Sequence, residues 1–487
     1  MKSSKNRVLI FRINRKLLTK FFILIINKYQ LSRKIQMKKF ISFLVLCSAI
    51  SVSGCWADGG GGSDGNEFWA ADMDTNEYYK VTAPLYKEGE YCKIHIENES
   101  RSLISDSTVD YIIDEFDNRI YPKITSKFGN ESDVDGNGKI VLLILDIRDG
   151  YKGSGGYIAG YFDSTNSLAN SVFYPHSNEC DMIYLDCNPA RPDTEDFQMT
   201  VAHEFQHLIN FTQKGLSDGI SQATWINEGL SSGAEYVYAE QHLSNRIRDY
   251  NSHQTDYSDG NNFYKWDNEL IDYATVYLFF QWIRIHSNDG DSIYKDILDS
   301  SYIDYNAVVE QVKAHLSDYY SGISIDNSSW TDIMTDWLIA NQINKTSGKF
   351  GYAGEITSLT EMNSKSGLKD LYPYEGVIRN NSSAYTPGFS GDNIIYRGIT
   401  ADGTVDSTSD YSGDFILALN TNPEDSGDLE EATLPASVKD QDKPLSNILF
   451  SQKQGSYRID AVIGAPGSGN SLEELKAKKK AKKNSGE

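Results

Sequence analysis

The chain has 487 residues, of which 39% are hydrophobic and 12% aromatic, so it can form sizeable cores and is predicted to fold into two or three domains. Its formal net charge is −22. The first 54 residues contain twelve Lys or Arg and no Asp or Glu. Without these twelve positive charges, the net charge of the remaining residues is −22 − 12 = −34. An acidic surface of this kind disfavours nucleic acid as a ligand and attracts cations such as calcium.

Residues 1–54 are interpreted as an upstream segment followed by a secretory signal, with Met37 as the true start. Two lysines after Met37 precede the apolar run 40–50, which is too short to span a bilayer. The sequence Val-Ser-Gly-Cys55 then resembles a bacterial lipoprotein signal. That resemblance implies lipid on Cys55 and a place in the bacterial cell envelope outside the cytoplasm, at the outer membrane or cell surface. An ordinary cleaved signal or a buried apolar segment is the alternative.

The mature chain is predicted to be of the α+β class. Residues 55–66 carry the lipidated cysteine and a Gly-rich tether, and residues 466–487 form a basic disordered tail. Between them we expect a main domain, 67–376, and a C-terminal β-sandwich-like region, 377–465. The main domain divides into a β/α half and a helical half, at residues 67–192 and 193–376.

Hydrophobic periodicity predicts the elements in chain order. A helix is expected to begin at the N-cap Ser107 and to end near Gly129. Strands follow at 141–147, 156–162, 171–174 and 182–185. The helical half is predicted to contain helices 197–211, 225–242, 272–285, 291–298, 305–316 and 330–342. The C-terminal region is predicted to contain strands 393–399, 414–419, 447–451 and 457–463.

The helix 197–211 contains the sequence HEFQH, in which His203 and His207 are four residues apart with Glu204 beside the first. This spacing places both imidazoles on one helix face, one turn apart. Two neutral imidazoles so placed can share a zinc ion, and an adjacent carboxylate can take a proton from metal-bound water. Two histidines on an ordinary amphipathic helix would be the structural alternative.

A third ligand is predicted at Glu228, about 20 residues after His207, in the first turn of the next helix. A loop and a returning helix can bring this carboxylate back to the imidazoles. A site with three protein ligands leaves the fourth zinc position for water. HExxH followed by Asn227-Glu228 resembles the gluzincins, the thermolysin-like peptidases that use glutamate as third ligand.

Five segments, two of which contain the motifs above, extend the resemblance to the hyicolysin-type metallopeptidases, over roughly residues 68–351. They are GGYIAGYFD, SNECDMIYLD, TVAHEFQHLI, TWINEGLSSGAEY and DYATVYLF. The resemblance implies a thermolysin-like zincin core, with a small mixed sheet, the HExxH helix and a helical lower half. It also implies a secreted or surface-attached zinc endopeptidase that acts on protein or peptide substrates.

Residue roles follow from this resemblance. Glu204 is expected to be the general base, and Tyr273 or Tyr277 to stabilise the oxyanion, with His242 and His253 as other candidates. Three residues are candidates for orienting the ligands: Asn227, Ser232 and Glu235. Ser232 departs from the thermolysin-like pattern, which has an aspartate bonded to the first zinc histidine at that position, so Glu235 is considered as its substitute.

The segment DVDGNGKI places oxygen side chains at alternate positions before a glycine, as in the first half of an EF-hand loop. The candidate calcium ligands are Asp133, Asp135, Asn137 and Asp146. The twelfth position is Ile144, where an EF-hand has a bidentate glutamate, so an EF-hand proper is not expected. An Asp/Asn/Gly turn that leads into a strand is the alternative.

Two other functions stay open at this point. A zinc aminopeptidase also carries Asn-Glu-Gly after HExxH, although no GxMEN-type segment for amine recognition precedes the motif here. The second alternative is a surface lipoprotein that uses a degenerate peptidase fold for binding. The sequence does not determine the oligomeric state or the pairing of Cys92, Cys180 and Cys187.

Overall fold

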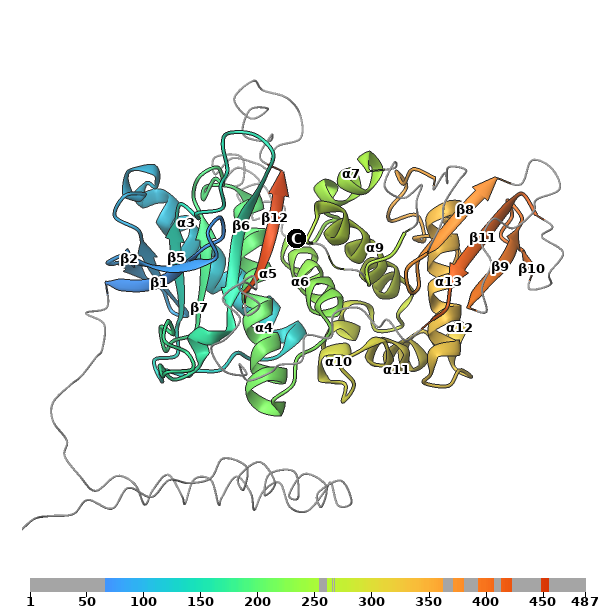
Figure 1. Cartoon of the computed structure of the whole chain (residues 1–487), viewed down its shortest axis with the longest axis horizontal. Coiled ribbons are helices and arrows are strands. Elements are labelled where there is room, and N and C mark those ends of the chain that lie inside the picture. Colours follow the sequence, from blue (N-terminus) through green and yellow to red (C-terminus); the bar gives the residue numbers. More distant parts are fainter. Residues whose placement is uncertain are drawn as a thin grey trace, which may run out of the picture. The chain divides into compact units, whose positions relative to one another are not determined.

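A computed structural model describes the residues that carry the fold: 66–253, 261–264, 266, 268–361, 371–380, 393–406, 413–422 and 448–454. The chain divides into two units, Met1–Gly62 and Ser63–Glu487, and the described residues all belong to the second. Helices and strands both contribute to this unit, so the fold is a mixed one that is compatible with the predicted α+β class (Figure 1).

A six-stranded mixed sheet is the centre of the β half, and its strand order is β12-β6-β7-β5-β4-β3. β4, β5 and β7 run parallel, whereas β3, β6 and β12 each pair antiparallel with their neighbours. The strands are β3 (Leu85–Glu88), β4 (Cys92–Ile96), β5 (Ile140–Leu145), β6 (Gly156–Asp163), β7 (Met182–Asp186) and β12 (Ile448–Gln454). The predicted strand 171–174 is wrong, because that segment forms bends and turns.

Both faces of this sheet are covered, as the all-apolar sequence of β5 requires. Side chains alternate between the faces with a period of two residues. Ile140, Leu142 and Ile144 join the core beneath the helices. Val141, Leu143 and Leu145 join a second core under the hairpin formed by β1 (Glu67–Asp72) and β2 (Glu77–Thr82).

A broken helix packs on the helical face of the sheet. It consists of α3 (Asp106–Glu115), a π-helical turn at Phe116–Ile120 and α4 (Tyr121–Phe128), and it ends at Gly129 as predicted. The predicted N-cap Ser107 is wrong by two residues. Ser105 has extended backbone and its side chain accepts a hydrogen bond from the Thr108 amide, which is the geometry that an N-cap requires.

The helical half is built around α5 (Glu195–Phe211), α6 (Thr224–Ala239) and α9 (Leu270–His286), and α6 contacts both of the others. Close packing of α6 on α9 depends on Gly229, because a Cβ there would overlap the ring of Phe280. Glu228, the preceding residue, is thereby held between α5 and α9. The remaining helices are α7 (Ser244–Ser252), α10 (Ile293–Asp299), α11 (Tyr305–His315), α12 (Ser317–Tyr320) and α13 (Asn327–Ile343). Of these, α7 and α12 were not predicted.

The C-terminal region contributes strands to two different sheets. Four strands form one sheet of order β10-β9-β11-β8, whose side chains Ile378, Ile399 and Leu417 join the core of the helical half. β12 instead pairs with β6 in the main sheet. The four strands are β8 (Gly376–Asn380), β9 (Ile394–Ile399), β10 (Val405–Asp406) and β11 (Phe415–Asn420). A sandwich within 377–465 therefore stays a prediction, and its expected strand 457–463 lies outside the described residues.

Cys55, the tether and the basic tail also lie outside the described residues. Within the described part of the chain, no helix has the length and apolar character needed to cross a bilayer. Cys92, Cys180 and Cys187 are buried free thiols.

Candidate metal centre

Helix α5 presents the three residues of the motif from one largely buried segment. It begins at the N-cap Thr194, whose side chain accepts a hydrogen bond from the Phe197 amide, and acidic residues in its first turn suit the helix dipole. His203, Glu204 and His207 have no exposed surface. The imidazole rings lie with their centroids 4.8 Å apart and nearly perpendicular to each other.

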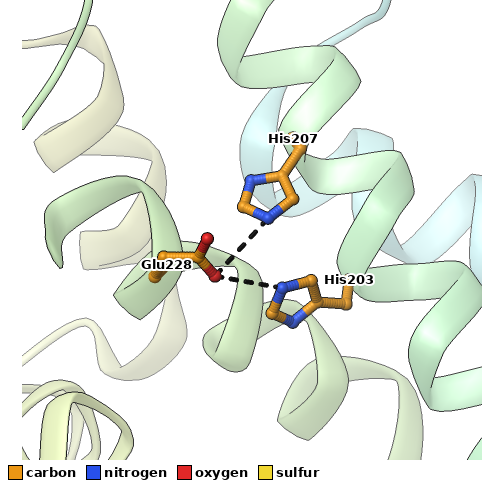
Figure 2. Close-up of side chains that lie close together, drawn as sticks. All are labelled: His203, His207 and Glu228. Atoms are coloured by element: carbon orange, nitrogen blue, oxygen red, sulfur yellow. Dashed lines mark hydrogen bonds and ion pairs between the residues drawn. The ribbon is translucent and has the colours of Figure 1, made fainter. Parts of the chain in front are cut away.

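Helix α6 brings Glu228 back to these imidazoles, as the sequence predicts (Figure 2). Glu228 Oε2 lies 3.2 Å from His203 Nε2 and 3.5 Å from His207 Nε2. One ligand atom of each residue falls within 4.8 Å of the others, which is compatible with a single metal ion among them. Such a set, two imidazole nitrogens and one carboxylate oxygen, is the donor set of a catalytic zinc site with an open position.

The electrostatics of the metal-free site show how strongly these groups interact. Burial by itself lowers the pKa of His203, but hydrogen bonds with Glu228 and Glu235 outweigh that effect and raise the pKa to about 9. Burial by itself raises the pKa of Glu228, but the charge of His207 and hydrogen bonds with both histidines lower the pKa to about 2. A proton on His203 therefore takes part of the place that a cation would fill.

Glu235 holds the first histidine. Its Oε1 lies 2.9 Å from His203 Nδ1 and 3.1 Å from Arg246 Nη2, and both Glu235 and Arg246 are buried. A carboxylate on the outer nitrogen fixes the orientation of a ligand imidazole and raises its basicity. Arg246, on α7, was not predicted, because nothing in its sequence surroundings links it to Glu235.

The second histidine is held by neighbours of Glu228. His207 Nδ1 lies 3.1 Å from Asn227 Oδ1 and 2.9 Å from Ser231 Oγ. Ser231 donates its own proton to Gln206, so its oxygen can accept from Nδ1–H and leave the Nε2 lone pair facing Glu228. Nε2 itself faces Glu228 Oε2 at 3.5 Å.

Of the three residues predicted to orient the ligands, Asn227 and Glu235 contact the histidines and Ser232 does not. The buried Ser232 hydroxyl has no hydrogen-bond partner among the described residues, and Ser231, one position earlier on α6, makes the contact that the prediction missed. Sequence spacing alone could not separate these adjacent serines.

Charge counting supports a divalent cation at this place. Three carboxylates, Glu204, Glu228 and Glu235, are buried with one guanidinium, that of Arg246. These carboxylates carry more negative charge than the one guanidinium compensates, in a region where burying charge is costly. The residues present therefore fit a zinc ion both in donor chemistry and in charge.

The two candidate tyrosines differ in their surroundings. The Tyr273 ring lies 6.4 Å from that of His203, and Arg246 stands 5.0 Å from its centroid. Burial, followed by the charge of Glu228, raises the pKa of Tyr273 well above its usual value, so its hydroxyl stays protonated and can donate. Tyr277 instead contacts His242 and accepts a hydrogen bond from the Leu243 amide, at 3.1 and 2.9 Å.

A second acidic group differs from the predicted calcium set. Asp133 and Asp135 lie close to Asp181, whose carboxylate accepts hydrogen bonds from Ser132 and the Val134 amide. Asp146 is not part of this group, because it follows β5 whereas the Asp133 loop precedes it, and a six-residue strand spans roughly 20 Å. Asn137 bonds to Asp135 within the loop. Calcium binding stays a prediction.

Comparison with known proteins agrees with this chemistry. The neutral metalloprotease ShpI of Staphylococcus hyicus is 30% identical over 305 aligned residues, which cover 60% of this chain and 66% of that protein. The chain thus matches just under two thirds of that relative's length. No family model matches the chain. The similarity supports a metallopeptidase family.

Proton release should accompany metal binding. Because the pKa of His203 in the metal-free chain is about 9, zinc must displace a proton at neutral pH, and its apparent affinity should fall about ten-fold per pH unit as pH decreases below that value. Calorimetric titration of zinc in buffers of different ionisation enthalpy measures this proton. Zinc binding without proton release at neutral pH would contradict the assignment of His203 as a ligand.

Glu235→Gln is expected to lower zinc affinity about 10–100-fold, because it weakens the hydrogen bond that holds His203. Ser232→Ala is the matched control on the same helix and should leave affinity unchanged, since its hydroxyl makes no hydrogen bond in the described structure. In Glu235→Gln the buried guanidinium of Arg246 loses its carboxylate partner. The double variant Glu235→Gln/Arg246→Met removes this guanidinium as well. If the double variant binds zinc as the unaltered chain does, Glu235 does not orient His203.

Proposed function

We propose that this chain is a lipid-anchored, zinc-dependent endopeptidase. The observation that carries the proposal is the meeting of His203, His207 and Glu228 around one point, with Glu204 buried beside His203 on the same helix. The metalloprotease relative supports the reaction class. The anchor rests on the lipobox-like sequence at Cys55, and it implies that the site works outside the cytoplasm, at the outer membrane or cell surface.

Bound zinc would polarise the scissile carbonyl and acidify the attacking water. The chain's own residues then have separate tasks. Glu204 accepts the proton of the water and later delivers it to the leaving amine. Glu235, Asn227 and Ser231 keep the imidazoles in the tautomers and orientations that ligation needs.

Tyr273 is the better placed of the two tyrosines to stabilise the oxyanion. Its ring lies beside His203, and its protonated hydroxyl provides the donor that developing negative charge needs. Tyr277 holds the start of α7 instead, because its hydroxyl binds the Leu243 amide.

The central experiment is hydrolysis of an internally quenched peptide with a blocked N-terminus. Glu204→Gln should bind zinc as the unaltered chain does but lower kcat about 10²–10⁴-fold, which is the usual contribution of a general base. Chelation should abolish activity, and added zinc should restore it. Full activity in Glu204→Gln would refute the proposed role, and cleavage of only unblocked peptides would favour an aminopeptidase.

Substitution of the two tyrosines should affect activity and stability differently. Tyr273→Phe should lower kcat about 10²–10³-fold, since it removes a hydrogen-bond donor to the oxyanion. Tyr277→Phe should keep kcat and lower the free energy of unfolding by about 1–3 kcal/mol, because the Leu243 amide loses its buried acceptor. Rate measurements and thermal unfolding of both variants check this. Equal rates in the two would rule out Tyr273 as the donor.

A further inference from the structure

β12 reaches the main sheet from a distant part of the chain. It pairs antiparallel with β6 along the whole of that strand, from Ile448 opposite Asp163 to Gln454 opposite Gly156. On its other side β6 pairs with β7 only through Gly160 and Tyr161. Figure 1 shows β12 alongside β6, and β12 also contacts α5 and α9. The outermost position of the sheet is thus filled by residues that follow the C-terminal sheet in sequence.

The strand that β12 covers lies against the general base. A Cβ added to Gly160 would come within 3.0 Å of Glu204 Cγ and 2.8 Å of Thr200 Cγ2. Glycine at this position lets α5 approach the sheet this closely. Ser451 is paired with Gly160 and Gln452 with Ile158, so Ala159 is the extra residue of a β-bulge in β6. Bulges of this kind are frequent beside active sites.

An edge strand with free backbone groups is a docking site for another extended chain, because main-chain hydrogen bonds supply affinity for any sequence. Here the outer edge of β6 runs past Glu204, and neighbouring strands lie about 4.8 Å apart. Any polypeptide paired to β6 would pass beside the candidate catalytic carboxylate. His203, Glu204 and His207 have no exposed surface, so a polypeptide can reach them only if part of the chain moves.

We propose that residues 448–454 occupy the outer edge of β6 as an intramolecular strand, and that the extended backbone of a substrate must displace them. The proposal rests on the proposed function for its catalytic consequence. β12 is not needed to complete the C-terminal sheet, which is formed by β8–β11. A tethered strand competes at high effective concentration, so displacement raises the apparent KM and leaves kcat unchanged.

Two variants of the full chain test the proposal. Gly156→Cys/Gln454→Cys joins opposite residues at one end of the β6–β12 ladder, where cross-strand neighbours are close enough for a disulfide. The single-cysteine variants are its controls, and the three native thiols of the described fold are buried. Leu449→Pro removes a backbone donor from β12, and Gln441→Pro, which precedes the strand, is its matched control.

Binding is measured first, in chains that also carry Glu204→Gln so that the probe is not consumed. The probe is a fluorescein-labelled peptide with the sequence of residues 445–456. We expect Leu449→Pro to bind the probe with about ten-fold higher affinity than Gln441→Pro. This factor corresponds to a control in which the edge of β6 is free in about one molecule in ten. The oxidised double-cysteine chain should bind the probe at least ten-fold more weakly than the same chain after reduction by a phosphine.

Activity against the blocked peptide is measured next, in the corresponding chains with Glu204 intact. Release should lower KM about ten-fold at constant kcat, and the disulfide should suppress cleavage until it is reduced. Equal probe affinity in the oxidised and reduced chains overturns the inference, even if Leu449→Pro fails to fold. If the probe affinities follow the expected order but no zinc-loaded chain cleaves the blocked peptide, the proposed peptidase activity is refuted. The proposed binding of β12 to the edge of β6 is then still supported.

Discussion

The position of Glu228 is the constraint on which the metal centre depends. Its Oε2 lies between the Nε2 atoms of two histidines one helical turn apart, and all three side chains are buried. α6 can bring the carboxylate there only because it packs closely on both α5 and α9, and Gly229 permits the second contact. A larger residue at 229 would overlap the Phe280 ring, so that either this ring or α6 would have to shift.

The negative charge of the same carboxylate is buried, and neighbouring groups compensate it in part. Glu204, Glu228 and Glu235 share one buried region with Arg246, and the arginine compensates one of the three negative charges. In the metal-free chain a proton on His203 compensates another, which is the physical meaning of its raised pKa. A divalent cation would complete the balance and displace that proton. The ligand residues and the groups behind them thus form one electrostatic unit.

A second close approach links this unit to the sheet. Gly160 brings β6 against Glu204. This one contact positions both the strand edge that can hold an extended peptide and the carboxylate that can act on that peptide. Pairing of β12 with this edge gives the C-terminal part of the chain a direct relation to the site. The four-stranded sheet formed by β8–β11 has another place, against the core of the helical half.

The sequence by itself determined the local features of this protein. The i, i+4 histidines and Glu204 between them could be predicted because helical spacing fixes relative positions within a turn or two. The strands β5, β6 and β7 and the helices α5, α6 and α9 were predicted to within about three residues for a similar reason, since apolar periodicity is a property of each segment. Glu228 could be predicted for a different reason, because its gap of about 20 residues after His207 allows a loop and a returning helix. Tertiary structure decided everything that joins distant segments: Arg246 behind Glu235, Asp181 beside Asp133, Tyr277 directed to Leu243 and β12 on β6. These pairings depend on which surfaces pack together, and no pattern within a short window of sequence records that choice.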